Sequence, residues 1–268
     1  MTLPNITNKQ QEIPRLFYQF RFLHRLHIQQ LLNHKYHNRI NNWLKDLTEK
    51  HYTEKLPKKN TFEQRTKPTV YRLGINGIRF LKTQDRISPE LLRKLYRGRD
   101  RSDNFINQCL MLADIYLDLR KQGTKNSAVS YEVTTASDFA SDDSPFHFLT
   151  ELAPHLVAKR MEKQKKRTAS RYHLLEIFEP TLPRYSVRKR LRSYLEFFYS
   201  NEWGNNTNRT TFPILFFICP DKPFLIYTKR FTKKLLEEEQ HPEDLSIQFA
   251  KAFDVKESGI SGAIWEEV

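Results

Sequence analysis

The sequence predicts a protein of mixed α and β structure in two parts, an α+β part followed by an α/β part. Two observations support this fold class, and a third, the distribution of charge, supports the division into two parts. Apolar residues recur at helical spacing through most of the first hundred residues. Strand-like segments alternate with amphipathic helices after residue 150. Positive charge is concentrated in the first hundred residues, which contain 21 Lys and Arg and 8 Asp and Glu. The remaining residues contain 24 Lys and Arg and 23 Asp and Glu.

Three helices are predicted first. Their ranges are 11–25, 27–34 and 36–52. In the third helix the apolar residues fall at i, i+3, i+4 and i+7, the spacing of one helix face; they are Ile40, Trp43, Leu44 and Leu47. The other face is polar and rich in asparagine, a poor helix former. Only a short turn separates the second and third helices, as in a helix-turn-helix, whose second helix enters the major groove of DNA.

A basic hairpin is predicted to follow. Strands at 52–56 and 68–74 flank the loop 57–67, and a short helix over 74–84 comes next. A hairpin with a basic tip directly after a helix-turn-helix is the arrangement of a winged helix. The alternative for this segment is a three-helix bundle with a hairpin that binds protein.

The polar face of the third helix and the hairpin loop supply the candidate DNA-binding residues. Asn pairs with an adenine edge and Arg with guanine, whereas Lys contacts phosphate and adds affinity without sequence information. The candidates are His37, Asn38, Arg39, Asn41, Asn42, Lys45, Lys58, Lys59, Arg65 and Lys67.

The middle of the chain is predicted to connect the two parts. Helices are expected over 89–97 and 101–121, and polar loops over 122–130 and 134–145. The longer helix is expected to pack in the core, although it could also dimerise. These features place the domains at residues 1–100, 101–122 and 123–268.

The second part is predicted to form a layered α/β domain. Strands are expected at 155–160, 171–179, 212–219, 246–253 and 263–268, and helices at 184–200 and 224–240. The basic runs 159–160 and 163–167 are interpreted as a solvated loop, with added DNA contacts as the alternative.

Composition narrows the function classes. The net charge of +14 favours a polyanionic partner, and nucleic acid is favoured over membrane because no basic amphipathic anchor is evident. The polar start and the lack of a long apolar run predict no leader and no membrane helix, hence a cytoplasmic protein. Cys109 and Cys219 lie among apolar neighbours and are expected to be reduced core thiols.

No cofactor or metal site is predicted. The chain has no Gly-rich phosphate loop, Cys-x-x-Cys pair or His-Glu-x-x-His motif. Two His pairs three residues apart, in "HRLH" (24–27) and "HKYH" (34–37), have no suitable third ligand nearby, so zinc is not expected.

Several segments resemble the replication-relaxation family, whose members occur on plasmids and other mobile elements. The segments are "VYRLGINGIRFL", "LAPHLVAKR", "HLLEIFEP", "RKRLRSYLEFFYSNEW" and "FFICPDKPFLIYTKRFTKKLLEEE". The resemblance covers nearly the whole chain. It implies an N-terminal winged helix, a C-terminal domain similar to the restriction-endonuclease fold, and DNA binding in replication control or conjugative mobilisation.

The nuclease motif of that fold is incomplete in this sequence. Such domains cut DNA where an Asp ends one strand and a Glu-x-Lys on the next helps to hold Mg²⁺ and orient water. Here the two positions read Pro154-His155 and Glu176-Ile177-Phe178. One carboxylate beside a His is a poor Mg²⁺ site. We therefore expect no enzyme, with His155 a plain surface or edge residue and Glu176 a remnant held in a hydrogen bond or salt bridge.

A rearranged nuclease site is the alternative. Lys189 or Arg190 could replace the missing Lys, and Glu179 could supply a second carboxylate, although it lies on the opposite strand face.

The sequence thus predicts a double-stranded-DNA-binding protein that acts in replication control or mobilisation. Replication or relaxase proteins are expected partners of the second domain, and a homodimer is possible. A metal-dependent DNA nuclease and a winged-helix transcriptional regulator that represses its own promoter are the alternatives.

Overall fold

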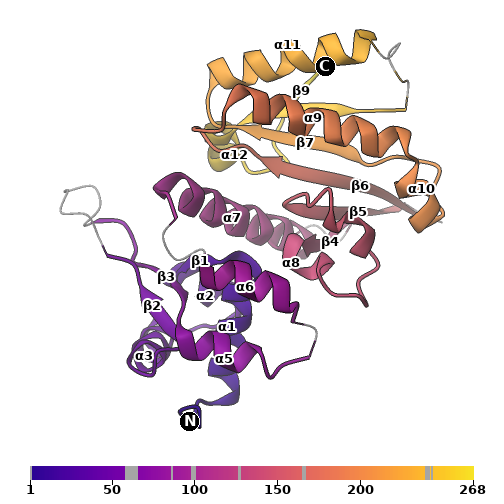
Figure 1. The fold of residues 1–268 in the computed structure, drawn as a ribbon. Helices are drawn as coiled ribbons and strands as arrows, with labels where there is room; N and C mark the ends of the chain where they lie inside the picture. The colour runs from indigo at the N-terminus through magenta and orange to yellow at the C-terminus, as the bar shows by residue number, and fades with distance from the viewer. Residues whose placement is uncertain are drawn as a thin grey trace. The chain divides into compact units, whose positions relative to one another are not determined.

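The computed structural model describes residues 2–57, 66–85, 87–97, 101–125, 128–164, 167–238, 242 and 244–268 (Figure 1). The chain forms two compact units. Unit 1 comprises Met1–Leu117 with Ala140–Ser144, and unit 2 comprises Asp118–Phe139 with Pro145–Val268. Both contain helices and strands, which confirms the predicted mixed fold class.

Unit 1 combines helices with one small sheet. Its elements are α1 (Asn8–Phe20), β1 (Phe22–His24), α2 (Arg25–Leu31), α3 (His37–Glu49), β2 (Thr53–Lys55), β3 (Val70–Leu73), α5 (Ile75–Leu81), α6 (Pro89–Arg97) and the first part of α7 (Asp103–Lys125). The three strands are antiparallel in the order β1-β3-β2. An ion pair between Arg72 and Glu54, with Nη2 and Oε2 3.0 Å apart, joins the two strands of the β2–β3 pair.

The first helix begins and ends at local signals. Thr7 and Gln10 form a capping box, in which each side chain bonds to the backbone of the other residue. The helix ends at Phe20 because Arg21 adopts a φ of 66°, which a helix cannot continue. The prediction of one helix over 11–25 was therefore wrong in its last turn, where residues 22–24 form strand β1.

The end of α3 lies very close to the start of α5. Backbone amides of Gly74 and Asn76 donate to the carbonyl oxygens of Tyr52 and His51, each at 2.9 Å. A Cβ atom on Gly74 would collide with the His51 carbonyl, and one on Gly77 with the Tyr52 carbonyl. Glycine at both positions allows this close backbone approach.

Unit 2 is built on a mixed six-stranded sheet in the order β4-β5-β6-β7-β8-β9. Strands β6, β7 and β8 are parallel, and the other neighbouring pairs are antiparallel. The strands are β4 (Val129–Thr135), β5 (Leu156–Gln164), β6 (Arg167–Ile177), β7 (Ile214–Cys219), β8 (Ile247–Lys251) and β9 (Glu266–Glu267). The shorter helical elements are α8 (Ala136–Phe139), the 3₁₀ helix η1 (His147–Thr150), α10 (Glu202–Thr207) and α12 (Ala252–Ser258).

Two long helices, α9 (Arg184–Tyr199) and α11 (Lys222–Glu238), lie side by side on one face of this sheet (Figure 1). Each follows one parallel strand and leads to the next, which is the connection that parallel strands require. Buried Leu191 and Leu235 of these helices share a core with Leu215 and Phe217 of β7. The sheet therefore holds the inward faces of α9 and α11 and leaves their outer faces to solvent.

Three sequence predictions for unit 2 require correction. Residues 129–135 form strand β4 rather than part of the loops expected over 122–130 and 134–145. Within the basic runs 159–160 and 163–167, residues 159–160, 163–164 and 167 belong to strands β5 and β6 rather than to a loop, and residues 165–166 lie outside the described residues. The strand expected over 246–253 was predicted two residues too long at its end, because residues 252–258 form helix α12.

We predict that Gly77→Ala destabilises unit 1 by about 2 kcal/mol, the range typical of a side chain forced into packed surroundings. The added Cβ would meet the Tyr52 carbonyl oxygen and approach Leu73 Cδ1 to 2.6 Å. Thermal unfolding of the full chain measures the effect.

Gly123→Ala is the matched control. The nearest atom to its Cβ, Ser130 Cα, is 3.5 Å away, an ordinary contact distance. Because Ala is the better helix former, this variant should keep or raise the melting temperature. An equal loss of stability in both variants would contradict the close approach at Gly77.

Candidate nucleic-acid interface

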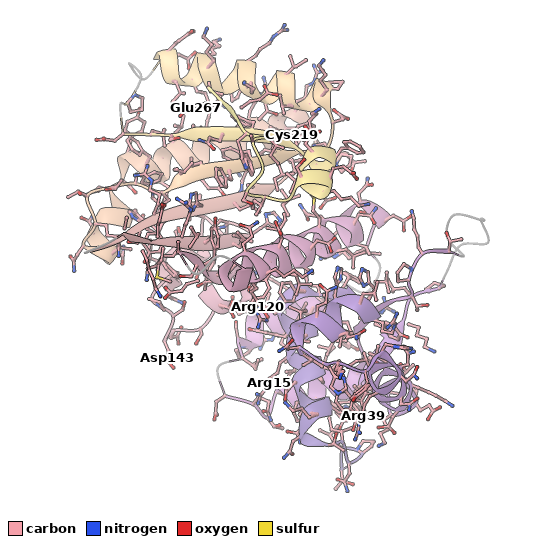
Figure 2. All side chains as sticks on the ribbon, turned by 180° about the vertical axis from the view of Figure 1, so that it is seen from behind. Arg15, Arg39, Arg120, Asp143, Cys219 and Glu267 are labelled. Carbon is pink, nitrogen blue, oxygen red and sulfur yellow. The ribbon has the colours of Figure 1, made fainter. Side chains whose placement is uncertain are left out.

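Helix α3 divides cleanly into a buried and an exposed side. Ile40, Leu44 and Leu47 are buried and attach the helix to unit 1, and Trp43 is half-buried beside them. The predicted contact residues of this helix are all exposed; they are His37, Asn38, Arg39, Asn41, Asn42 and Lys45. Figure 2 locates Arg39 on the helix. The structure therefore brings the six together on one solvent-facing surface, which we call the α3 polar face.

The amide side chains of the α3 polar face have no hydrogen-bond partner among the described residues. Asn38, Asn41 and Asn42 form no hydrogen bond with any residue that the structure describes. Arg39 lies over the Trp43 ring, with its guanidinium carbon 5.9 Å from the ring centroid. Lys45 is 4.0 Å from Glu49, an exposed pair of little energetic weight. Each asparagine thus presents a donor and an acceptor to an outside partner.

A small polar network fixes the C-terminal half of α3. Gln10 Nε2 donates to Asp46 Oδ2 at 2.6 Å, and Lys50 Nζ donates to the same carboxylate at 3.0 Å and to the Asn5 carbonyl at 2.8 Å. Burial raises the pKa of Asp46, but the hydrogen bonds from Lys50 and Gln10 outweigh it and lower that pKa overall. The carboxylate is therefore charged at neutral pH and ties α3 to α1.

The N-terminus of α3 adds features that sequence reasoning missed. No side chain caps the helix at Tyr36, whose side chain is 63% exposed. The Lys35 ammonium lies 5.6 Å from the Tyr36 ring centroid. Uncapped backbone N–H groups and a nearby cation are the features that bind phosphate at a helix N-terminus.

The hairpin predicted to carry the remaining contacts is only partly described. Strands β2 and β3 pair as expected, and Lys67 is exposed ahead of β3. Lys58, Lys59 and Arg65 lie outside the described residues.

Glu176 is the centre of a separate cluster in unit 2. Its Oε2 accepts hydrogen bonds from Arg190 Nη2 at 2.6 Å and from the Tyr194 hydroxyl at 2.8 Å. Arg190 also donates to the carbonyl oxygens of Leu152 and Ala153. The remnant carboxylate is thus held in a salt bridge, one of the two roles expected for it.

His155 belongs to this cluster, so its description as a plain surface or edge residue was wrong. Its Nδ1 lies 3.6 Å from Glu176 Oε1 and accepts a hydrogen bond from the Ile177 amide at 3.3 Å. The pairing of β5 with β6 causes this placement, because the backbone of His155 bonds to Leu175 on the neighbouring strand. Tyr194, one turn beyond Arg190 on α9, is the member that sequence reasoning missed.

Charge partners dominate the electrostatics of the cluster. Burial raises the pKa of Glu176, but the neighbouring His155 and Arg190 outweigh it and lower that pKa to about 2. Burial and the adjacent carboxylate raise the pKa of Tyr194. A carboxylate this strongly stabilised in its charged form is a poor general base at neutral pH.

Among the described residues, no cluster of metal ligands accompanies Glu176. Lys189 is exposed, and Arg190 rather than Lys189 reaches the carboxylate. Within the described ranges, no group of three His, Cys, Asp or Glu side chains is placed to hold a metal ion.

The basic run on β5 is engaged by neighbouring carboxylates. Lys159 Nζ lies 2.7 Å from Glu132 Oε2, and Arg160 Nη2 lies 2.9 Å from Glu162 Oε2.

Cys109 and Cys219 are both buried, and burial raises the pKa of the Cys219 thiol to about 12.

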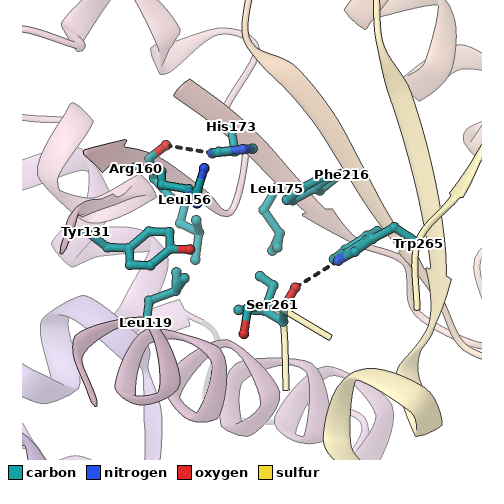
Figure 3. Close-up of a pocket in the computed structure, with 11 residues that line it drawn as sticks. Leu119, Tyr131, Leu156, Arg160, His173, Leu175, Phe216, Ser261 and Trp265 are labelled. Carbon is teal, nitrogen blue, oxygen red and sulfur yellow. Dashed lines mark hydrogen bonds between the residues drawn. The ribbon is translucent and has the colours of Figure 1, made fainter. Parts of the chain in front are cut away.

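A pocket of about 270 Å³ lies on the other face of the unit 2 sheet (Figure 3). Phe216 stacks between His173 and Trp265, at centroid distances of 4.9 and 4.1 Å. Burial lowers the pKa of His173 to about 4, so this imidazole is neutral at pH 7. The lining is mostly apolar and lacks a carboxylate, so it offers no acid–base pair.

We predict that Glu176→Gln lowers the unfolding free energy by about 3 kcal/mol, because it leaves the Arg190 charge without its partner. The folded pKa of about 2 lies below the ordinary 4.5, so the wild-type contribution is complete above pH 4.5 and is lost as the pH falls toward 2. Urea unfolding across this range should show that the variant lacks this part of the acid dependence.

Glu132→Gln is the matched control, because Glu132 pairs with Lys159 at an exposed site. It should cost less than about 1 kcal/mol. Identical acid profiles for wild type and Glu176→Gln would contradict the buried ion pair.

Comparisons with known proteins identify the family of this chain. None of the described helices combines the length and hydrophobicity needed to cross a membrane. No curated protein and no solved structure matches the chain. The replication-relaxation family matches residues 15–211, which include all of α3, the β2–β3 pair and the Glu176 cluster. This match covers well over half of the chain, and the protein therefore belongs to the replication-relaxation family.

Proposed function

We propose that this protein binds double-stranded DNA through the α3 polar face and acts in replication control or conjugative mobilisation of a plasmid or other mobile element. The observation that carries the proposal is the row of exposed Asn and Arg side chains on α3, whose amides have no partner among the described residues. Family membership suggests the replication role.

The topology of unit 1 supports docking as a winged helix. Helices α1, α2 and α3 precede an antiparallel β2–β3 pair, and β1 completes a three-stranded sheet. In a helix-turn-helix the second helix of the pair lies in the major groove. Here α3 takes that place, and the connection between β2 and β3 is the proposed wing along phosphate or the minor groove.

The side chains of the α3 polar face suit base recognition. Asn38, Asn41 and Asn42 can each pair with the N6 and N7 atoms of adenine, and Arg39 with O6 and N7 of guanine. Lys45 and Lys67 suit phosphate contacts, which supply affinity and salt dependence. A helix built only for solubility would not need three poor helix formers within five positions.

We propose that unit 2 is a non-catalytic module that contacts replication or relaxase proteins or a second copy of the chain. The state of Glu176 supports this, because Arg190 and Tyr194 occupy the carboxylate oxygen that a metal ion would need. The action of the whole protein then depends on where its DNA site lies, at an origin of replication or of transfer.

Replacing Asn38 and Asn42 by Ala should weaken binding to the specific site more than binding to random duplex. Loss of one bidentate adenine contact costs about 1–3 kcal/mol of discrimination, or roughly 5- to 150-fold. Fluorescence anisotropy with both duplexes measures the ratio of the two dissociation constants. Unchanged discrimination would show that α3 is not the recognition helix.

Replacing Lys58 and Lys59 by Ala should weaken specific and random binding alike. Each lost phosphate contact should reduce the slope of log Kd against log salt by about 0.9. The same titrations at several salt concentrations provide the slope. A selective loss of specific binding would instead place these lysines at base edges.

A further inference from the structure

The near-neutral charge of the second half of the chain conceals an uneven distribution. Helix α9 carries five Lys and Arg residues and one Glu, and α11 carries five Lys and Arg residues and two Glu. Both helices cover the same face of the unit 2 sheet (Figure 1). The positive charges of unit 2 are therefore gathered on one side of the sheet by two helices that are separate in sequence.

Six exposed cations make up this surface, which we call the α9–α11 basic surface. They are Arg184, Arg188, Lys189, Arg192, Lys222 and Arg230. None of the six forms an ion pair with a carboxylate of the described chain. By contrast, Lys233 and Lys234, further along α11, each have a glutamate one turn away, at 4.0 and 3.7 Å.

Ring contacts order two of the arginines. The guanidinium carbon of Arg184 is 4.9 Å from the centroid of Tyr227, and that of Arg192 is 5.4 Å from the centroid of Phe231. Both contacts cross from α9 to α11. An arginine held over an aromatic ring keeps its N–H groups available and loses less entropy on binding.

The arginines of α9 form a regular row. Arg184, Arg188 and Arg192 are spaced four residues apart, so they follow one another along one side of the helix at intervals of about 6 Å. Three like charges in a row repel one another unless an anion lies over them. Only a ligand with closely repeated negative charges meets all of them at once.

We propose that the α9–α11 basic surface binds the phosphate backbone of duplex DNA as a second, sequence-independent contact. This inference rests on the proposed function, which supplies duplex DNA as the polyanion. Duplex DNA carries one charge per about 1.7 Å of helix axis, so its phosphates are dense enough to supply a partner to each arginine of a row with intervals of about 6 Å. One guanidinium group can donate two parallel hydrogen bonds to the oxygens of a phosphate, so arginine suits this role better than lysine.

The two units would then make different contributions to DNA binding. Base contacts at the α3 polar face select the site, and phosphate contacts at the α9–α11 basic surface raise the affinity for any sequence.

The test uses the full chain and a labelled short duplex of random sequence. Arg188→Gln with Arg230→Gln removes two charges without touching the Tyr227 and Phe231 ring contacts. Lys233→Gln with Lys256→Gln is the matched control, because it removes two exposed charges of unit 2 outside the surface. Anisotropy at several salt concentrations gives Kd and the salt slope for each protein.

The arginine variant should bind about tenfold more weakly near 0.1 M salt, and its slope should fall by about 1.8, the value for two lost phosphate contacts. The control should stay within about twofold of wild type. Equal behaviour of the two variants overturns the inference. Loss of binding to phosphatidylserine vesicles in the arginine variant with unchanged DNA binding also overturns it, in favour of a membrane surface.

Combining each variant with Asn38→Ala and Asn42→Ala separates this inference from the proposed function. If the asparagine changes leave discrimination intact while the arginine changes weaken random binding, the α3 proposal fails and this one stands. If discrimination falls but the arginine changes have no effect, the opposite holds.

Discussion

The orientation of α3 depends on one close backbone contact within unit 1. His51 and Tyr52, which follow the end of the helix, accept hydrogen bonds from the backbone of Asn76 and Gly74 at the start of α5. Asn76 Nδ2 also donates to the Lys50 carbonyl at 2.8 Å. Because glycine removes the side chain at the point of contact, α3, β2 and α5 meet without intervening atoms. The polar face of α3 then points outward as a consequence of the packing beneath it.

The sequence predicted α3 well because its two faces differ sharply. Four apolar residues at helical spacing require a helix, and the structure places that helix at His37–Glu49. Strand β1 could not be predicted in the same way. Its three residues lie within a pattern that continues the spacing of the preceding helix, and the pattern does not reveal the positive φ of Arg21 at which the helix ends. Base contacts at the α3 polar face remain a prediction.

In unit 2 the long-range partners were the hardest to predict. Val129, Tyr131 and Val133 alternate with polar residues, a signal for strand β4 that the surrounding Gly, Ser and Asn obscured. Glu176 was identified from the incomplete motif, but its bond to Tyr194 depends on how α9 packs on the sheet. The total charge of this half also hid the α9–α11 basic surface, because a sum over sequence does not distinguish the faces of a fold.

We propose above that the α3 polar face gives this protein a preferred DNA sequence. The most direct test is to bind the full chain to a random pool of short duplexes at two salt concentrations and to sequence the retained fraction. We expect an enriched motif together with a steep fall of affinity as salt rises. Retention without any enriched motif, or no retention at either salt concentration, would contradict it.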